Sequence, residues 1–398
     1  MDAEHFNGER LRKARIYNGL TLTELAEKTN ISKQSISLYE NNKNVPDYQR
    51  IQRIAMELNF PFDYFFQTDK MKARTETTYF RSQATATKKN RSAQSTKLEF
   101  VAALYEVLWK YVDFPCYKDI QVHFDGYDTV EECNSPDAIN EMEMVAQTVR
   151  EAWNLGNGPI KNMQYELERH GILVTYLSTD DDKIDAFSQR TFIGGSDVYL
   201  IAVALEKVYE NRIRFDMAHE LGHILMHPWS EDLDAIPKEE FKSRERQANM
   251  FAGAFLLPRD SFGNDVKQYP TDLRYYQFLK KKWHVSIQAM IYRANQINII
   301  TSNQYQYLMR QISKNGWRTK EPDDIPYTMN ESVFQGAIDL LFENHILTAE
   351  SLMKEFQRSG INLYPEMVEE LLHLRSGTLK TKSRVIPLFQ LKEEHSEK

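Results

Sequence analysis

The chain has 398 residues, of which 41% are hydrophobic and 12% aromatic, enough to form several packed domains and too many for a disordered chain. Lys and Arg number 50 against 57 Asp and Glu, a formal charge of -7, so any affinity for nucleic acid must come from a local basic surface. The first residues are polar, no apolar run is long enough to span a bilayer, and the two cysteines form no CxxC motif. We therefore expect a cytoplasmic protein without a membrane partner.

The N-terminal segment is predicted to form four short helices, over residues 8–18, 21–28, 32–39 and 48–58. Ser32 is in position to cap the third helix, and the turn that precedes it gives the spacing of a helix-turn-helix. We predict an all-α helix-turn-helix bundle over residues 1–68.

This segment resembles Xre-type repressor DNA-binding domains through Leu25-Ala26, Ile31-Ser32, residues 34–37, Tyr39-Glu40 and Pro46. The resemblance implies that the partner is a double-stranded DNA operator, and it places four residues at the start of the recognition helix: Lys33, Gln34, Ser35 and Ser37. The amide of Gln34 suits adenine, because it both donates and accepts hydrogen bonds. A small helical bundle that binds protein is the alternative.

A basic segment from Lys70 to Lys97 follows, with eight Lys and Arg against Glu76 alone. It either contacts DNA phosphates or serves as a solubilising linker. Its Ser, Thr and Gln content favours a partly extended connector, which would be the place for a peptidase in the same chain to cut. With a predicted helix over 98–112, we define residues 69–136 as a basic linker and helical connector.

The most informative motif is His219-Glu220-Leu221-Gly222-His223, within an apolar helical segment. An HExxH run places two imidazoles one turn apart, as zinc ligands, beside a glutamate that can act as general base. The sequence thus predicts a catalytic Zn2+ site with His219 and His223 as ligands and Glu220 as the base.

A third ligand must come from elsewhere in the chain. Met226 and Trp229 exclude the longer HExxHxxGxxH pattern, so we expect Glu245, which opens an apolar helical stretch. Asn249, one turn later, would hold a ligand histidine by a hydrogen bond to its other ring nitrogen. Competing acidic residues lie in the polar stretch between the two motifs: Glu231, Asp232, Asp234, Glu239 and Glu240.

The residues from 211 to 227 and from 245 to 258 resemble the ImmA/IrrE family of zinc metallopeptidases, and the likeness covers about residues 140–265. It implies that His219, His223 and Glu245 bind zinc, that Glu220 is the base, and that the substrate is a helix-turn-helix repressor. We expect an α+β zincin-like peptidase domain over 137–265, with strands at 172–177 and 198–203. His227 and Arg214 are expected to be structural, and the group that stabilises the oxyanion is not identified.

The rest of the chain is predicted to be helical, so the fold class is mainly α with the α+β domain inside it. We expect a helical extension over 266–327, with Lys280 to Lys282 on a solvated face, and a helical C-terminal region over 328–398. That last region could sense a ligand, dock a partner or form a homodimer.

Together these features predict a DNA-binding transcriptional regulator whose zinc-dependent peptidase cleaves a helix-turn-helix repressor or a partner protein. The alternative is a non-proteolytic regulator, or an antitoxin-like DNA-binding protein, in which the peptidase fold senses a ligand or binds a partner.

Overall fold

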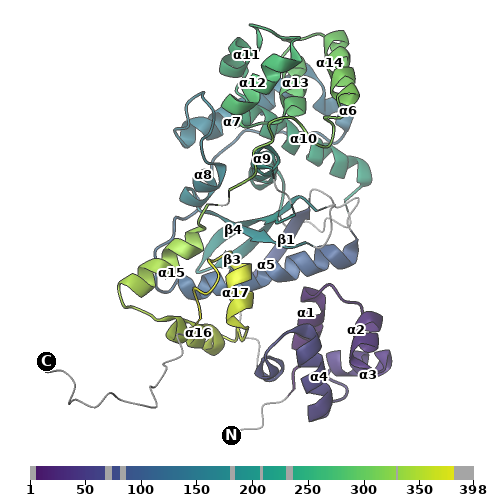
Figure 1. Cartoon of the computed structure of the whole chain (residues 1–398), viewed down its shortest axis with the longest axis vertical. Helices are drawn as coiled ribbons and strands as arrows, with labels where there is room; N and C mark the ends of the chain where they lie inside the picture. Colours follow the sequence, from purple (N-terminus) through teal and green to yellow (C-terminus); the bar gives the residue numbers. More distant parts are fainter. Residues whose placement is uncertain are drawn as a thin grey trace, which may run out of the picture.

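The computed structural model describes residues 6–67, 87–179, 184–206, 209–229, 236–328 and 330–380, together with the backbone of 74–80 (Figure 1). No helix among these residues has both the length and the apolar character that crossing a bilayer requires. The architecture is mainly helical around one small sheet, which confirms the predicted fold class.

The N-terminal unit is a compact helical bundle whose four α-helices agree with the prediction to within a residue or two: α1 (Gly8–Tyr17), α2 (Leu22–Thr29), α3 (Lys33–Glu40) and α4 (Tyr48–Leu58). The 3-10 helix η1 (Phe62–Phe66) follows them and was not predicted. Local chemistry sets these boundaries. Thr21 and Glu24 form a reciprocal capping box at the start of α2, and the Ser32 side chain caps α3. Asn30 ends α2 in the left-handed conformation, which makes the tight turn into α3.

A four-stranded sheet lies at the centre of the molecule, in the order β1-β3-β4-β2. Its strands are β1 (Arg74–Phe80), β2 (Ile172–Leu177), β3 (Ala186–Ile193) and β4 (Ser196–Ala204). β2 runs parallel to β4, whereas β3 is antiparallel to both β4 and β1. Gly194 and Gly195, both at positive φ, close the tight β3–β4 hairpin, where other residues would be strained.

The connector contains more regular structure than the partly extended segment that its composition predicted. Residues 74–80 form β1 in the sheet, and α5 (Lys88–Leu108) begins ten residues before the predicted helix at 98. Thr87 caps α5 through the backbone amide of Asn90, a start signal that the run of basic residues obscured. These parts are more regularly structured than the composition predicted, and residues 69–73 and 81–86 of the connector lie outside the described residues.

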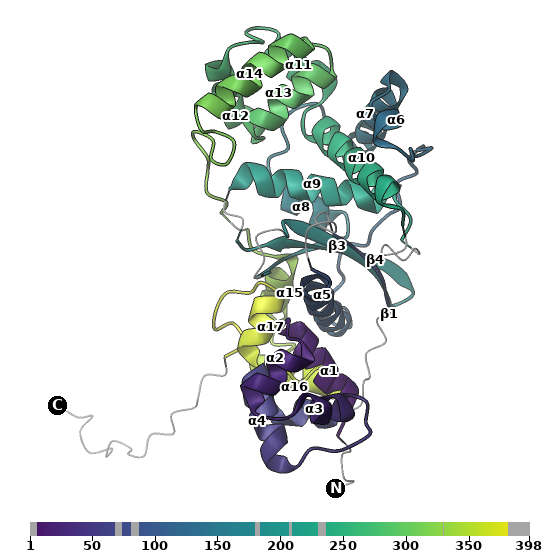
Figure 2. The ribbon, with the colours of Figure 1, turned by 90° about the vertical axis from the view of Figure 1, so that its right-hand side faces the viewer.

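Helices cover both faces of the sheet, and Figures 1 and 2 show α9 on one face and α5 on the other. Alternate residues of the strands divide between two cores, as the period of a strand requires. Ile172, Val174 and Ile201 belong to the core on the α9 side, while Leu173, Leu200 and Phe187 belong to the core on the α5 side.

The α9 side of the sheet carries the helices between residues 130 and 314: α6 (Val130–Cys133), α7 (Pro136–Ala152), α8 (Met163–Arg169), α9 (Glu210–Met226), α10 (Lys238–Leu256), α11 (Arg259–Val266), α12 (Leu273–Trp283), α13 (Ile287–Gln296) and α14 (Ser302–Lys314). They share one continuous apolar core, in which α10 packs against both α9 and α7. This layer holds the HExxH helix between the sheet and the outer helices.

The α5 side carries the C-terminal helices α15 (Val333–Glu343), α16 (Ala349–Arg358) and α17 (Pro365–Leu371), in one core with the N-terminal bundle. The Phe100 ring of α5 contacts three rings of that bundle, Tyr17, Phe60 and Tyr64. The Arg10 guanidinium donates to the carbonyl of Gly360, at 2.7 Å. α5 therefore joins the N-terminal bundle, the sheet and the end of the chain.

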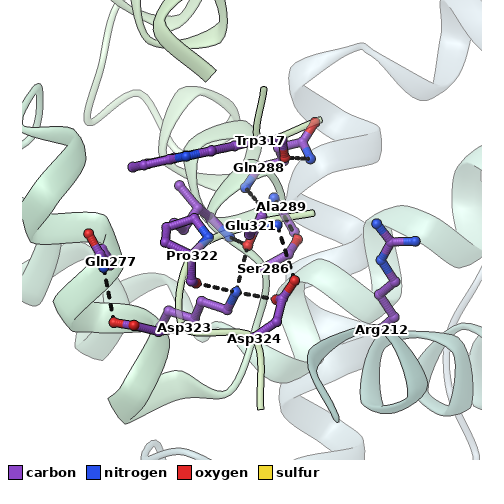
Figure 3. Close-up of polar contacts among 12 residues, drawn as sticks. Arg212, Gln277, Ser286, Gln288, Ala289, Trp317, Glu321, Pro322, Asp323 and Asp324 are labelled. Carbon is purple, nitrogen blue, oxygen red and sulfur yellow. Dashed lines mark hydrogen bonds and ion pairs between the residues drawn. The ribbon is translucent and has the colours of Figure 1, made fainter. Parts of the chain in front are cut away.

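The lysines of α12 do not share the solvated face that the sequence predicted. Lys280 is buried and pairs with the carboxylates of Glu321 and Asp324. Glu321 also accepts the backbone amides of Ile287 and Gln288, and Figure 3 shows Glu321 next to Ser286 and Ala289 at the start of α13. Lys281 and Lys282 are exposed, as expected.

Candidate metal centre

The centre of the site is the contact between α9 and α10. His219 and His223 are four residues apart on α9 and both are buried, at 0% and 1% exposure. Gly222 lies between them, and a Cβ at that position would be 3.2 Å from the Ala248 Cα. The missing side chain therefore allows α10 to approach α9 closely enough to bring Glu245 to the two imidazoles.

Three side chains converge at this contact. The Nε2 atoms of His219 and His223 are 3.0 Å apart, and the Glu245 carboxylate oxygens lie 3.4 Å and 3.2 Å from them. Ligands about 2.0–2.2 Å from a tetrahedral zinc ion are separated by about 3.3 Å. The three side chains thus have the spacing of a zinc coordination sphere.

The hydrogen bonds of Asn249 assign the tautomer of His219. The Asn249 side-chain amide donates to the carbonyl of Glu245, which directs its oxygen at the other end toward His219 Nδ1, 3.2 Å away. That oxygen only accepts, so Nδ1 of His219 carries the proton and Nε2 presents a lone pair.

A longer chain of hydrogen bonds does the same for His223. The Gln247 amide nitrogen donates to the carbonyl of Tyr127 and to Ser243, so its oxygen accepts from Nε2 of His227. Burial lowers the pKa of His227 well below its usual value, so this ring is neutral and its Nδ1 is an acceptor. His223 Nδ1, at 2.8 Å, is then the donor, and in the neutral ring the Nε2 lone pair of His223 faces that of His219.

With both rings neutral, two nitrogen lone pairs and a carboxylate meet at this point. Such a donor set suits a divalent cation, and nitrogen with carboxylate ligands suits zinc. His227 has the structural place that we expected, but it orients His223 rather than only capping α9.

Glu220 directly follows His219 on α9, and its side chain reaches strand β3 of the sheet. Its Oε2 accepts a hydrogen bond of 2.5 Å from the Ser188 hydroxyl of β3, and both side chains are fully buried. The carboxylate is therefore held beside the ligand group without belonging to it. Ser188 was not singled out as a functional residue, because its strand was not predicted.

The other candidates are placed elsewhere. Glu239 and Glu240 lie in the first turn of α10, while Glu231, Asp232 and Asp234 fall outside the described residues. Arg214 is buried and bonds the carbonyls of Ile160 and Lys161, which agrees with the structural role expected of it.

The predicted DNA-contacting residues lie on α3. Lys33 and Gln34 are exposed, Ser37 is half-buried, and the half-buried Ser35 shares a 2.8 Å hydrogen bond with the capping Ser32. Figures 1 and 2 show the bundle beside α5, with α1 nearest to it. The basic connector has less positive charge available for DNA than its composition suggests, because Lys89 forms an ion pair with Glu24 at 2.7 Å.

Family comparisons match two separate parts of the chain. Residues 8–69 match a helix-turn-helix domain, and residues 167–295 match the IrrE N-terminal-like domain. The chain joins an Xre-type helix-turn-helix domain to an ImmA/IrrE-like domain. This confirms the two resemblances seen in the sequence, and the second domain is metallopeptidase-like.

Individual relatives match less of the chain. The HTH-type transcriptional regulator ImmR of Bacillus subtilis (strain 168) is 34% identical over 70 residues, which are 18% of this chain and 55% of that protein. The match thus spans about half of the relative's length. A Mycobacterium tuberculosis transcriptional regulator of known structure has a TM-score of 0.29 and 23% identity, over 40% of this chain and 49% of its own, too low to support an argument.

The ligand geometry predicts that purified protein holds about one zinc ion per chain. His223→Ala and Glu245→Ala should each lose most of it, because two remaining ligands bind zinc weakly. Metal analysis after dialysis measures the loss, and the exposed His345→Asn is the matched control, since asparagine tolerates the left-handed backbone there. Retention of zinc by both ligand variants would contradict this site.

Proposed function

We propose that this helix-turn-helix regulator is also a zinc-dependent peptidase, and that it cleaves a helix-turn-helix repressor or a partner protein. The observation that carries the proposal is the separation of roles around α9. His219, His223 and Glu245 present lone pairs to one point, while Ser188 holds the carboxylate of Glu220 apart from them. A domain that only binds a ligand has no need of a carboxylate positioned in this way.

Zinc bound by the three ligands would polarise the peptide carbonyl and make a nearby water more acidic. Glu220 then accepts a proton from the water that attacks the carbonyl carbon, and donates it to the leaving amine as the C–N bond breaks. The hydrogen bond from Ser188 keeps the carboxylate in one orientation through both transfers. Asn249 and His227 keep the ligand imidazoles in the tautomers that leave Nε2 open.

The helix-turn-helix domain implies DNA as a partner, and we propose that Lys33, Gln34, Ser35 and Ser37 contact an operator. Both helix starts that form the motif are capped, and α3 has exposed side chains at its N-terminal end. Binding to paired half-sites would require a homodimer. A regulator of this kind acts in the cytoplasm, where its operator is found.

The peptidase proposal predicts a loss of cleavage without a loss of metal. Glu220→Gln keeps the shape of the side chain but removes the base, so cleavage should fall about 10²–10⁴-fold. Sequencing of protein N-termini from cells that express the wild-type chain or the variant reveals the products. The exposed Glu239→Gln is the matched control. If the new N-termini are the same with Glu220→Gln, this site does not make them.

The DNA proposal predicts that Gln34→Ala discriminates less well between the preferred duplex and random duplex. The wild-type chain first selects its preferred duplex from a random pool. Gln34→Ala should then bind that duplex more weakly by about 1–3 kcal/mol, with little change on random duplex, because a bidentate base contact is lost. Gln52→Ala, an exposed glutamine on α4, is the control. Equal behaviour of the two variants would exclude Gln34 as a base-reading residue.

A further inference from the structure

β3 is the strand that borders the candidate catalytic centre. Its Ser188 hydroxyl bonds the carboxylate of Glu220, and α9 packs over β3 and β4. One edge of β3 pairs with β4, so only its other edge is available to a further strand. A polypeptide on that outer edge would run one strand spacing, about 4.8 Å, from the backbone of Ser188.

That position is taken by β1, which comes from the connector of the same chain. β1 pairs with β3 in antiparallel register, with Thr78 opposite Gln189 and Tyr79 opposite Ser188. Tyr79 of β1 therefore lies opposite Ser188, the residue whose hydroxyl bonds the proposed base Glu220. β1 thus forms one edge of the sheet, and β2 forms the opposite edge.

The sequence of β1 suits a strand that can be exchanged. It reads Arg-Thr-Glu-Thr-Thr-Tyr-Phe and has no aliphatic residue, in contrast to β4, where Val198 to Ala204 are buried. The register also shifts between Thr75 and Thr78, which interrupts the ladder. Backbone hydrogen bonds are available to any extended segment, so another polypeptide could replace β1 at little cost.

We propose that the outer edge of β3 is the docking site for an extended protein segment, and that β1 is its resident occupant. The inference rests on the proposed peptidase, because hydrolysis of a peptide bond needs an extended backbone beside the catalytic groups. A substrate strand must compete with β1, which has the high effective concentration of an intramolecular partner. Access to the centre is thus limited by the chain's own connector.

This occupancy also links the two domains. The connector leaves the helix-turn-helix bundle after η1 and enters α5, to which the bundle is attached by the Lys89–Glu24 and Lys13–Glu99 ion pairs. A movement of the bundle relative to α5 would act on the chain on both sides of β1. A partner that displaces the bundle would therefore favour release of β3.

The test uses proline at two neighbouring positions of β1, Thr78→Pro and Tyr79→Pro, in the full chain carrying Glu220→Gln. Neighbouring residues of an antiparallel strand alternate, so one of them donates its N–H to β3 and the other directs it away. Proline should release β1 only at the donating position, and the other variant is the matched control. The probe is a fluorescent peptide of residues 70–84, with binding followed by anisotropy.

We expect one of the two variants to bind this peptide at least about tenfold more tightly than the parent, because the intramolecular competitor is lost. Hydrogen exchange of residues 186–193 should report the same event, with faster exchange in that variant and a return to slow exchange when peptide is added. Equal peptide affinity in the parent and both variants would overturn the proposal, as would unchanged exchange of β3 in both variants.

The same variants made with Glu220 intact separate this inference from the peptidase. Cleavage of the bound peptide supports both. Binding without cleavage, in protein shown to contain zinc, would reject the proposed activity on this segment and leave the occupancy of β3 standing.

Discussion

The close contact between α9 and α10 is the constraint on which the site depends. Gly222 removes the side chain that would hold the helices apart, and Glu245 thereby reaches the Nε2 atoms of His219 and His223. Three groups that would be costly to bury together without a cation are assembled in this way. The Nδ1 atoms of His219 and His223 are hydrogen-bonded to Asn249 and His227. These hydrogen bonds fix the two rings so that their Nε2 atoms stay directed at the Glu245 carboxylate.

The sequence predicted those parts of the site that depend on local spacing. His219, Glu220 and His223 lie on one helix, and Glu245 and Asn249 lie one turn apart on another, so helical periodicity alone brings each set together. The same reasoning predicted the bundle, where caps such as Thr21 and Ser32 mark the helix starts. Two strands, at 172–177 and 198–203, were also predicted, because their apolar runs are continuous.

The parts that were missed depend on contacts between distant segments. Ser188 reaches Glu220 only because β3 lies under α9, and a serine in an unpredicted strand carries no signal of that contact. β1 was assigned to a linker because its polar composition hides a strand that pairs through its backbone. Lys280 resembled a surface lysine, and its partners Glu321 and Asp324 come from a segment about forty residues later.

Both the helix-turn-helix bundle and the sheet pack against the same helix, α5. One helix supports the sheet beneath the candidate centre, holds the helix-turn-helix bundle through Phe100, and contacts the C-terminal helices. The connector between the two domains contributes β1 to the sheet, next to β3, whose Ser188 bonds Glu220.

The central claim is that α9 and α10 form a zinc centre with two imidazoles and one carboxylate. X-ray absorption at the zinc K-edge of the zinc-loaded full chain tests it most directly, because it reports ligand types and bond lengths. The account predicts four nitrogen or oxygen ligands at about 2.0–2.1 Å, with scattering from two imidazole rings and no sulfur. A spectrum with zinc–sulfur distances near 2.3 Å, or with oxygen ligands alone, would contradict it.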